Sequence, residues 1–210
     1  MTPPVAIGHS LVYTRPPVLK KLRFVARRQL RYVHWMSRLA PSAFAIRLAG
    51  AQDAPYLPGV EQSAGALFRS IPELAWVADE PIGGVDDFLP AIAARTVWVA
   101  EDGEAGLIGE LRGEISGEGL HILELAVASE FQRRGLGRRL LDFAGEAVRA
   151  RGLRAMTLTT FRHVAWNAPF YARYGFIELR EGELDARLRQ TLRDEEARGL
   201  SNRCAMRFSL

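Results

Sequence analysis

The chain has 210 residues, of which 48% are hydrophobic, so it can bury the core of one domain and still carry an extension. Its single cysteine, Cys204, excludes an internal disulfide and a cysteine-based zinc site, and the four histidines are too scattered for a metal-binding motif. No apolar run approaches the ~20 residues of a membrane span, and residues 1–15 lack the apolar core of a signal peptide. We therefore expect a cytoplasmic protein with no metal and no stable membrane association.

The formal net charge of +4 comes from one end of the chain. Residues 1–52 hold nine of the 28 Lys and Arg residues and no Asp or Glu, whereas residues 53–210 carry a net charge of −5. Because the basic excess belongs to the N-terminal segment, it is a poor indication that the remainder binds nucleic acid. We expect no nucleic-acid partner.

Residues 1–42 are predicted to form a basic extension ahead of the domain. Four prolines within residues 1–17 indicate a disordered start, and residues 18–39 show apolar side chains at helical spacing opposite a basic face. Such an amphipathic helix suits adhesion to an anionic membrane or nucleic acid, and its Arg-rich, acid-poor composition is similar to that of an organelle-targeting segment. The alternative is a poorly structured extension, with translation starting at Met36.

The domain is predicted to occupy residues 43–210 and to begin with a short alternating strand at 44–49. A helix capped by Asp53 and disturbed by Pro58 and Gly59 follows, then a loop at 71–85 and a short helix at 85–94. Alternating or apolar runs joined by tight turns predict an antiparallel meander of three strands, at residues 96–100, 105–115 and 121–128.

The third of these strands runs through a glycine-rich turn into a helix. Apolar residues at helical spacing begin at Leu136 and predict a helix to about residue 151. Glycines let the backbone approach a ligand, the first N–H groups of a helix attract anions, and the planar fork of arginine suits phosphate. We therefore predict a phosphate-binding turn formed by Gln132, Arg133, Arg134, Gly135, Leu136, Gly137 and Arg138.

Two other phosphate motifs do not fit this turn. A dinucleotide site would need a third glycine where Leu140 stands, and a nucleoside-triphosphate loop would need a Gly-Lys-Ser/Thr sequence. The alternative is an ordinary strand-to-helix turn that happens to be rich in arginine. Beyond it, a strand at 155–160, parallel to the one before the helix, is expected from the strand-helix-strand order. The remaining predicted elements are a short helix at 165–174, a strand at 176–180, a polar helix at 184–199 and a closing strand at 203–208.

Two segments carry a resemblance to a known family. The turn Gln132-Arg-Arg-Gly-Leu-Gly137 and the segment Asn167-Ala-Pro-Phe-Tyr-Ala-Arg-Tyr-Gly-Phe176 resemble, in the right order, two motifs of the GNAT superfamily of N-acetyltransferases. The second motif is shortened between its Asn and its Tyr. The resemblance implies an α/β (α+β) GNAT fold: a mixed, mostly antiparallel sheet of about six or seven strands, helices on both faces, and a central parallel strand pair that splays apart.

The resemblance also implies a function and a site. The chain would transfer an acetyl group from acetyl-CoA to a primary amine, as a monomer or homodimer. The pantetheine arm would lie in the splayed gap, against the main chain of Leu125, Ala126 and Val127, and Asn167 would contact the coenzyme. The alternative is a non-catalytic CoA-binding regulatory module on the same fold.

Two residues would carry the chemistry. Glu124 stands where many GNAT enzymes place a general base, and Tyr171 where the acid for the departing thiolate lies. The alternatives are that Glu124 faces solvent or pairs with an arginine, and that Tyr171 only packs in its helix. The acceptor pocket would lie in the region that contains Glu61, Phe68, Trp76 and Asp79.

Overall fold

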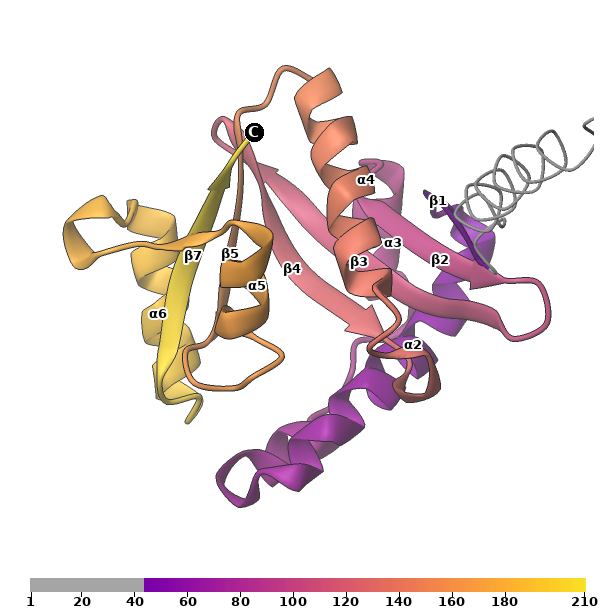
Figure 1. The fold of residues 1–210 in the computed structure, drawn as a ribbon, viewed down its shortest axis with the longest axis horizontal. Coiled ribbons are helices and arrows are strands. Elements are labelled where there is room, and N and C mark those ends of the chain that lie inside the picture. Colours follow the sequence, from indigo (N-terminus) through magenta and orange to yellow (C-terminus); the bar gives the residue numbers. More distant parts are fainter. Residues whose placement is uncertain (1–43) are drawn as a thin grey trace, which may run out of the picture. The chain divides into compact units, whose positions relative to one another are not determined.

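A seven-stranded sheet organises the part of the chain that the structure describes, residues 44–210 of a computed structural model (Figure 1). The strand order is β1-β2-β3-β4-β5-β7-β6, and the β4–β5 pair is parallel while the other neighbouring pairs are antiparallel. This confirms the predicted mixed, mostly antiparallel sheet with one central parallel pair. The predicted extension, residues 1–42, lies outside the described residues.

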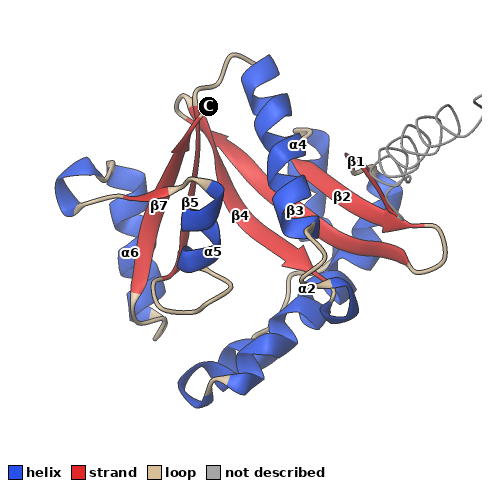
Figure 2. Cartoon of the chain, in the orientation of Figure 1, coloured by secondary structure: helices blue, strands red, loops and turns tan. Residues whose placement is uncertain are grey.

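The sheet is built from short and long strands in nearly the predicted places (Figure 2). The strands are β1 (Phe44–Leu48), β2 (Val97–Asp102), β3 (Gly106–Ser116), β4 (Gly119–Val127), β5 (Ala155–Phe161), β6 (Ile177–Glu178) and β7 (Arg203–Ser209). The α-helices are α2 (Leu57–Gly65), α3 (Val85–Ala93), α4 (Leu136–Ala150), α5 (Ala168–Tyr174) and α6 (Ala186–Ala197). The 3-10 helices are η2 (Ala51–Tyr56), η3 (Ala66–Ser70), η4 (Pro72–Asp79), η5 (Ser129–Phe131) and η6 (Glu181–Glu183).

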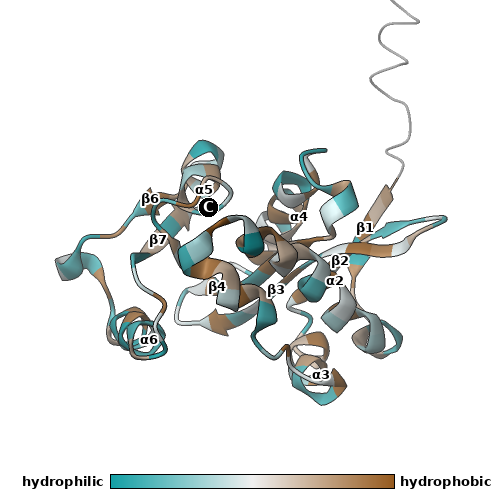
Figure 3. Ribbon diagram, turned by 90° about the horizontal axis from the view of Figure 1, so that it is seen from below, coloured by the Kyte–Doolittle hydropathy of each residue, from teal (hydrophilic) through white to brown (hydrophobic). Residues whose placement is uncertain are grey.

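The main core lies between the sheet and α4. Leu136, Leu140, Leu141, Ala144 and Val148 recur at helical spacing and are all buried, which is the apolar stripe that the sequence predicts. Burying one leucine contributes about 1.5–3 kcal/mol, so this stripe fixes α4 against the sheet. Helix α5 packs beside it, whereas α2, α3 and α6 cover the opposite face over smaller apolar clusters. Helix α6 is largely hydrophilic (Figure 3).

A β-bulge in β4 decides which side chains face α2. Arg112 of β3 is paired with Glu124, but the next residue, Gly113, is paired with Ile122, so Leu123 is an extra residue that is 45% exposed. The inserted residue reverses the alternation of side chains along the strand. Ile122 therefore belongs to the core beneath α4, while Glu124 shares the opposite face with Arg112.

Four local predictions need correction. Residues 72–79 form the 3-10 helix η4 rather than a loop, with Pro72 in its first turn, where a missing N–H costs nothing. Asp53 is not the N-cap: it is the third residue of η2, and its carboxylate accepts the Gly50 N–H at 2.8 Å. The predicted helices at 165–174 and 184–199 begin later, at Ala168 and Ala186. The strand at 176–180 pairs only over two residues, at the sheet edge.

Candidate functional site

Strands β4 and β5 pair over a short distance and then separate (Figure 1). Their pairing stops at His121 and Thr157, although β4 continues to Val127 and β5 to Phe161. Backbone N–H and C=O groups along the facing edges therefore need other partners. The Leu125 N–H donates to Glu124 Oε1 at 3.1 Å, and the Val127 carbonyl accepts the Gln132 side chain at 2.9 Å. Two of the main-chain groups expected to contact a ligand are thus engaged within the protein.

The predicted phosphate-binding turn lies between η5 and the N-terminus of α4. Gly135 precedes the helix with a φ of 82°, in the left-handed region that only glycine adopts without strain. Leu136 is 2% exposed, and its side chain belongs to the core beneath the turn. A Cβ on Gly137 would lie 3.4 Å from Phe170 Cζ and 3.8 Å from Leu125 Cδ2. The start of α4 therefore packs closely against both strand β4 and helix α5.

Three exposed arginines surround this turn. Arg133, Arg134 and Arg138 are exposed, and the last two lie over the rings of Phe131 and Tyr174, at 5.1 and 5.4 Å from the ring centroids. Cation–π contacts restrain a guanidinium without neutralising it. The structure thus brings positive charges and the free N–H groups of α4 to one place, as an anion site requires.

Glu124 lies in a cluster of charged side chains on the other face of β4. Arg112 is directly across from it on β3, and Arg112 Nη2 pairs with Glu61 Oε1 of α2 at 2.8 Å. Burial, and next the charge of Glu61, raise the pKa of Glu124 to about 7. Glu124 therefore exchanges a proton near neutral pH. Sequence reasoning placed Glu61 in the acceptor region but did not connect it to Glu124.

Glu110 is a further member of this cluster that sequence reasoning missed. It is fully buried on β3, and neither carboxyl oxygen has a hydrogen-bond partner of ordinary geometry among residues 44–210. Burial, followed by the neighbouring Glu61 and Glu124, raises its pKa well above the ordinary value, so its protonated form is favoured. The available signal was the spacing of Glu110 and Arg112, which puts both on one face of a strand.

Tyr171 faces the site from α5. Its ring packs against Phe170 and Phe176, with centroids 5.1 and 5.5 Å away. Burial, and then the charge of Glu124, raise its pKa above the ordinary value of a phenol, so it keeps its proton. Asn167 stands before this helix, and its carbonyl accepts the N–H groups of Phe170 and Tyr171 at 2.8 and 3.1 Å. Asn167 thus positions Tyr171 through its backbone.

A second ion pair borders the site on the side of β7. Arg203 forms two hydrogen bonds to the Glu195 carboxylate of α6, at 2.7 and 2.9 Å, and Thr159 donates to the same carboxylate at 2.6 Å. The charge of Arg203 lowers the pKa values of Glu124 and Tyr171, though less than burial raises them. The sequence described this part of α6 only as polar.

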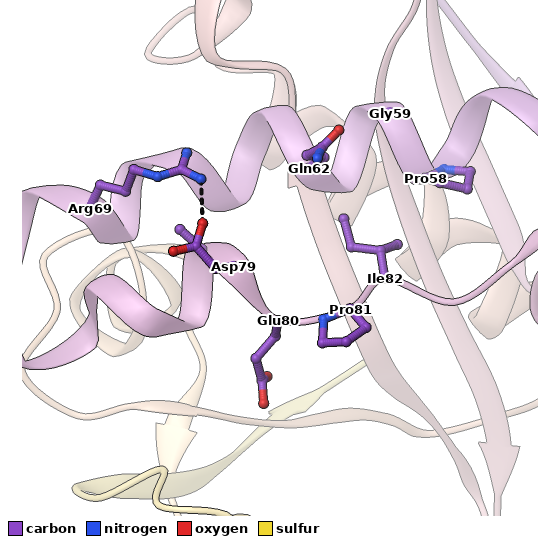
Figure 4. Close-up of a pocket in the computed structure, with 9 residues that line it drawn as sticks. Pro58, Gly59, Gln62, Arg69, Asp79, Glu80, Pro81 and Ile82 are labelled. Carbon is purple, nitrogen blue, oxygen red and sulfur yellow. Dashed lines mark hydrogen bonds and ion pairs between the residues drawn. The ribbon is translucent and has the colours of Figure 1, made fainter.

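The residues expected in the acceptor region separate into distinct places. Phe68 packs with Phe161 and Trp166 at the end of β5, with centroid distances of 5.5 and 5.8 Å. Trp76 is 39% exposed, and Asp79 pairs with Arg69 at 2.6 Å. Asp79 and Arg69 line a hollow of ≈ 460 Å³ beside α2 (Figure 4). The other residues around it are Pro58, Gly59, Gln62, Ala78, Glu80, Pro81 and Ile82, and they include none of the Glu124 cluster.

Two general features of the chain complete the description. Within residues 44–210, no helix is long and apolar enough to cross a membrane. In the same range, no three or more His, Cys, Asp or Glu side chains are grouped so that they could hold a metal ion.

Comparison with known proteins gives a family match and several similar folds. Residues 93–178 match the family model of the acetyltransferase (GNAT) domain. The fold is similar to that of a PaiA N-acetyltransferase from Thermoplasma acidophilum solved in complex with coenzyme A (16% identity, 80% of this chain, 99% of that chain, TM-score 0.59).

Two further solved structures are similar to the chain. One is the ribosomal-protein-S18-alanine N-acetyltransferase of Escherichia coli, at 16% identity over 79% of this chain and 93% of that chain, with a TM-score of 0.56. The other is the N-acetylglutamate synthase of Neisseria gonorrhoeae complexed with coenzyme A and N-acetyl-glutamate, at 20% identity over 80% of this chain and a TM-score of 0.59. The chain spans 35% of that larger protein. At these identities the similarity establishes the fold.

Proposed function

Because the chain belongs to the GNAT superfamily of N-acetyltransferases, we propose that it transfers an acetyl group from acetyl-CoA to a primary amine. The amine attacks directly, without a covalent intermediate on the protein. The observation that carries this proposal is the separation of β4 from β5 beside the N-terminus of α4, with Glu124 close enough to Tyr171 for its charge to raise the pKa of the phenol. We assign the activity to residues 43–210.

The residues of the turn and strand edge fit a coenzyme with a pyrophosphate and an amide-rich arm. The backbone of Gly135, Leu136 and Gly137 opens α4 with free N–H groups, and Arg133, Arg134 and Arg138 supply positive charge. Along the edge of β4 from Leu125 to Val127, main-chain groups now paired with Glu124 and Gln132 would exchange partners to bind the amide-rich arm, and Asn167 lies at the start of α5. When bound, acetyl-CoA supplies the thioester carbonyl that the amine attacks.

Glu124 is the proposed general base. An amine reaches the site mostly as an ammonium ion, which has no lone pair until a base removes a proton. A carboxyl with a pKa of about 7 is matched to this task at neutral pH. The Leu125 N–H, which now donates to Glu124, is the proposed donor to the developing oxyanion at the strand edge.

Tyr171 is the proposed acid for the departing thiolate. Its phenol stays protonated because burial and the Glu124 charge both disfavour the phenolate. Base and acid thus lie on different elements, β4 and α5: Glu124 accepts the proton of the amine in its ionised form, and Tyr171 holds the proton that it donates to the thiolate.

Calorimetric titration of the full chain with acetyl-CoA tests the coenzyme site, followed by a panel of amines with detection of the released thiol. Micromolar binding together with thiol release that depends on an amine would support the enzyme. Binding without turnover on any amine would instead favour a non-catalytic CoA-binding regulatory module, and the absence of binding would exclude both.

A further inference from the structure

The guanidinium of Arg112 lies between two carboxylates and pairs with only one of them. Glu124 is its direct partner in the β3–β4 register, so their side chains start about 5 Å apart on the same face. Arg112 nevertheless bonds to Glu61 of α2 at 2.8 Å, in an ion pair whose side chains are 21% and 12% exposed. Its other neighbour is the ring of Phe88, 4.8 Å from the guanidinium carbon. The guanidinium is therefore directed toward α2 and α3.

The buried carboxyl of Glu110 does not compete for this charge. It shares the face of β3 with Arg112, two residues away, but forms no hydrogen bond of ordinary geometry with it. The Arg112 Nε is also buried and without a hydrogen-bond partner among residues 44–210. An isolated buried carboxylate is costly, so Glu110 retains its proton. One positive charge is then left for two carboxylates, Glu61 and Glu124.

The Arg203 guanidinium, whose charge also lowers the pKa of Glu124, is likewise paired with another carboxylate. Arg203 of β7 holds the Glu195 carboxylate of α6 through two hydrogen bonds, at 2.7 and 2.9 Å. Both arginines near Glu124 are thus paired with a carboxylate from a helix on the same face of the sheet. Glu124 itself accepts only the Leu125 N–H among the hydrogen bonds of the described residues.

We propose that Glu61 is a positioning residue that holds the Arg112 guanidinium on α2 and so leaves the Glu124 carboxylate without an ion pair. The inference rests on the proposed function, in which Glu124 is the general base. A carboxylate paired with a guanidinium is a weak base, because the opposite charge within about 4–6 Å lowers its pKa by about 1–3 pH units. Glu61 therefore preserves basicity without touching the reacting atoms.

The charged groups that face Glu124 shift its pKa in opposite directions. Glu61 of α2 raises the pKa of Glu124, while Arg112 of β3 and Arg203 of β7 lower it. The pKa values of Tyr171 of α5 and Glu110 of β3 are both raised, mainly by burial, which favours their neutral forms, so they contribute little charge. Removing the Glu61 charge frees Arg112 to turn toward Glu124, and both changes lower the pKa of the base.

The test follows the titration of Glu124 itself, in the full chain labelled with ¹³C at the glutamate carboxyl carbons. The Glu124 signal is identified by its loss in Glu124→Gln. In the native protein it should titrate near pH 7. In Glu61→Gln the midpoint should fall by about 1–3 pH units, and in Glu61→Asp, which keeps the charge, it should stay near the native value. Glu73→Gln, at an exposed position of η4, serves as the matched control and should leave the Glu124 midpoint unchanged.

A second variant separates the proposed effect from a general disturbance. Arg112→Gln removes the positive charge, so the Glu124 midpoint should rise, opposite to its movement in Glu61→Gln. Opposite shifts in the two folded variants support the proposal, and if Arg112→Gln is poorly folded, a lowered midpoint in Glu61→Gln with a native midpoint in Glu61→Asp supports it. An unchanged or raised midpoint in folded Glu61→Gln, or a lowered midpoint in Arg112→Gln, would overturn it. The titration tests the role of Glu61 and needs neither acceptor nor coenzyme. The assignment of Glu124 as the base is tested separately, by turnover: full activity of Glu124→Gln would refute that assignment and leave the titration result unaffected.

Discussion

Replacing Glu124 by glutamine should stabilise the folded protein at alkaline pH while removing its activity. The Glu124 carboxyl titrates near pH 7 in the fold, against 4.5 ordinarily, because burial and Glu61 disfavour its charge. One pH unit corresponds to about 1.4 kcal/mol, so full ionisation costs the folded state at most about 3.5 kcal/mol. Since the side chain is only partly buried, we take about 1–3 kcal/mol as the expected penalty.

The sign of the effect follows from proton binding. Between pH 4.5 and about 7 the unfolded chain loses the Glu124 proton while the folded protein keeps it, so stability falls as pH rises through this window. Below the window the group contributes nothing, and above it the penalty is constant. Glu124→Gln lacks this titration but can still accept the Leu125 N–H. Its stability relative to the native protein should therefore increase from pH 5 to pH 8.

Urea unfolding of both proteins at several pH values measures this difference. At pH 8 the midpoint of Glu124→Gln should lie above that of the native protein by the equivalent of about 1–3 kcal/mol, and at pH 5 by less than about 1 kcal/mol. Glu118→Gln, an exposed substitution in the turn between β3 and β4, controls for the loss of an ordinary charge. A difference that does not vary with pH, or destabilisation at pH 8, would show that the fold does not hold Glu124 as argued.

Three further outcomes are expected. Gly137→Trp should abolish acetyl-CoA binding in calorimetry. Gly137→Ala should retain binding, because the added Cβ would lie 3.4 Å from Phe170, an ordinary contact. Normal binding by the tryptophan variant would refute the placement of the coenzyme. Tyr171→Phe should lower turnover by about 10²-fold without weakening acetyl-CoA binding, as loss of a general acid does, and unchanged turnover would assign the tyrosine to packing alone. Gly135→Ala should lower the free energy of unfolding by about 1–2 kcal/mol in urea, because the left-handed backbone disfavours a side chain. Apart from its chain neighbours, nothing lies within 4 Å of the added Cβ, so no steric clash adds to this effect. An unchanged urea midpoint would contradict the argument.

Elements whose signals are local could be predicted from the amino-acid sequence alone. The stripe from Leu136 to Val148, the glycine turn before it and the strand meander all follow from spacing within a few residues, and the structure contains each of them. Helix η4 was missed because Pro72 and its neighbours suit a loop equally well, and its packing with Phe161 and Leu200 is not visible in a local window.

The surroundings of Glu124 were decided only by the tertiary structure. The sequence singled out Glu124 through its motif, but the bulge at Leu123 decides which face the carboxyl occupies. Its pKa depends on Glu61, Arg112 and Arg203, which come from α2, β3 and β7. Burial and charge act through space rather than along the chain, so no sequence window contains them. The candidate base was therefore readable from the sequence, while what makes it basic was not.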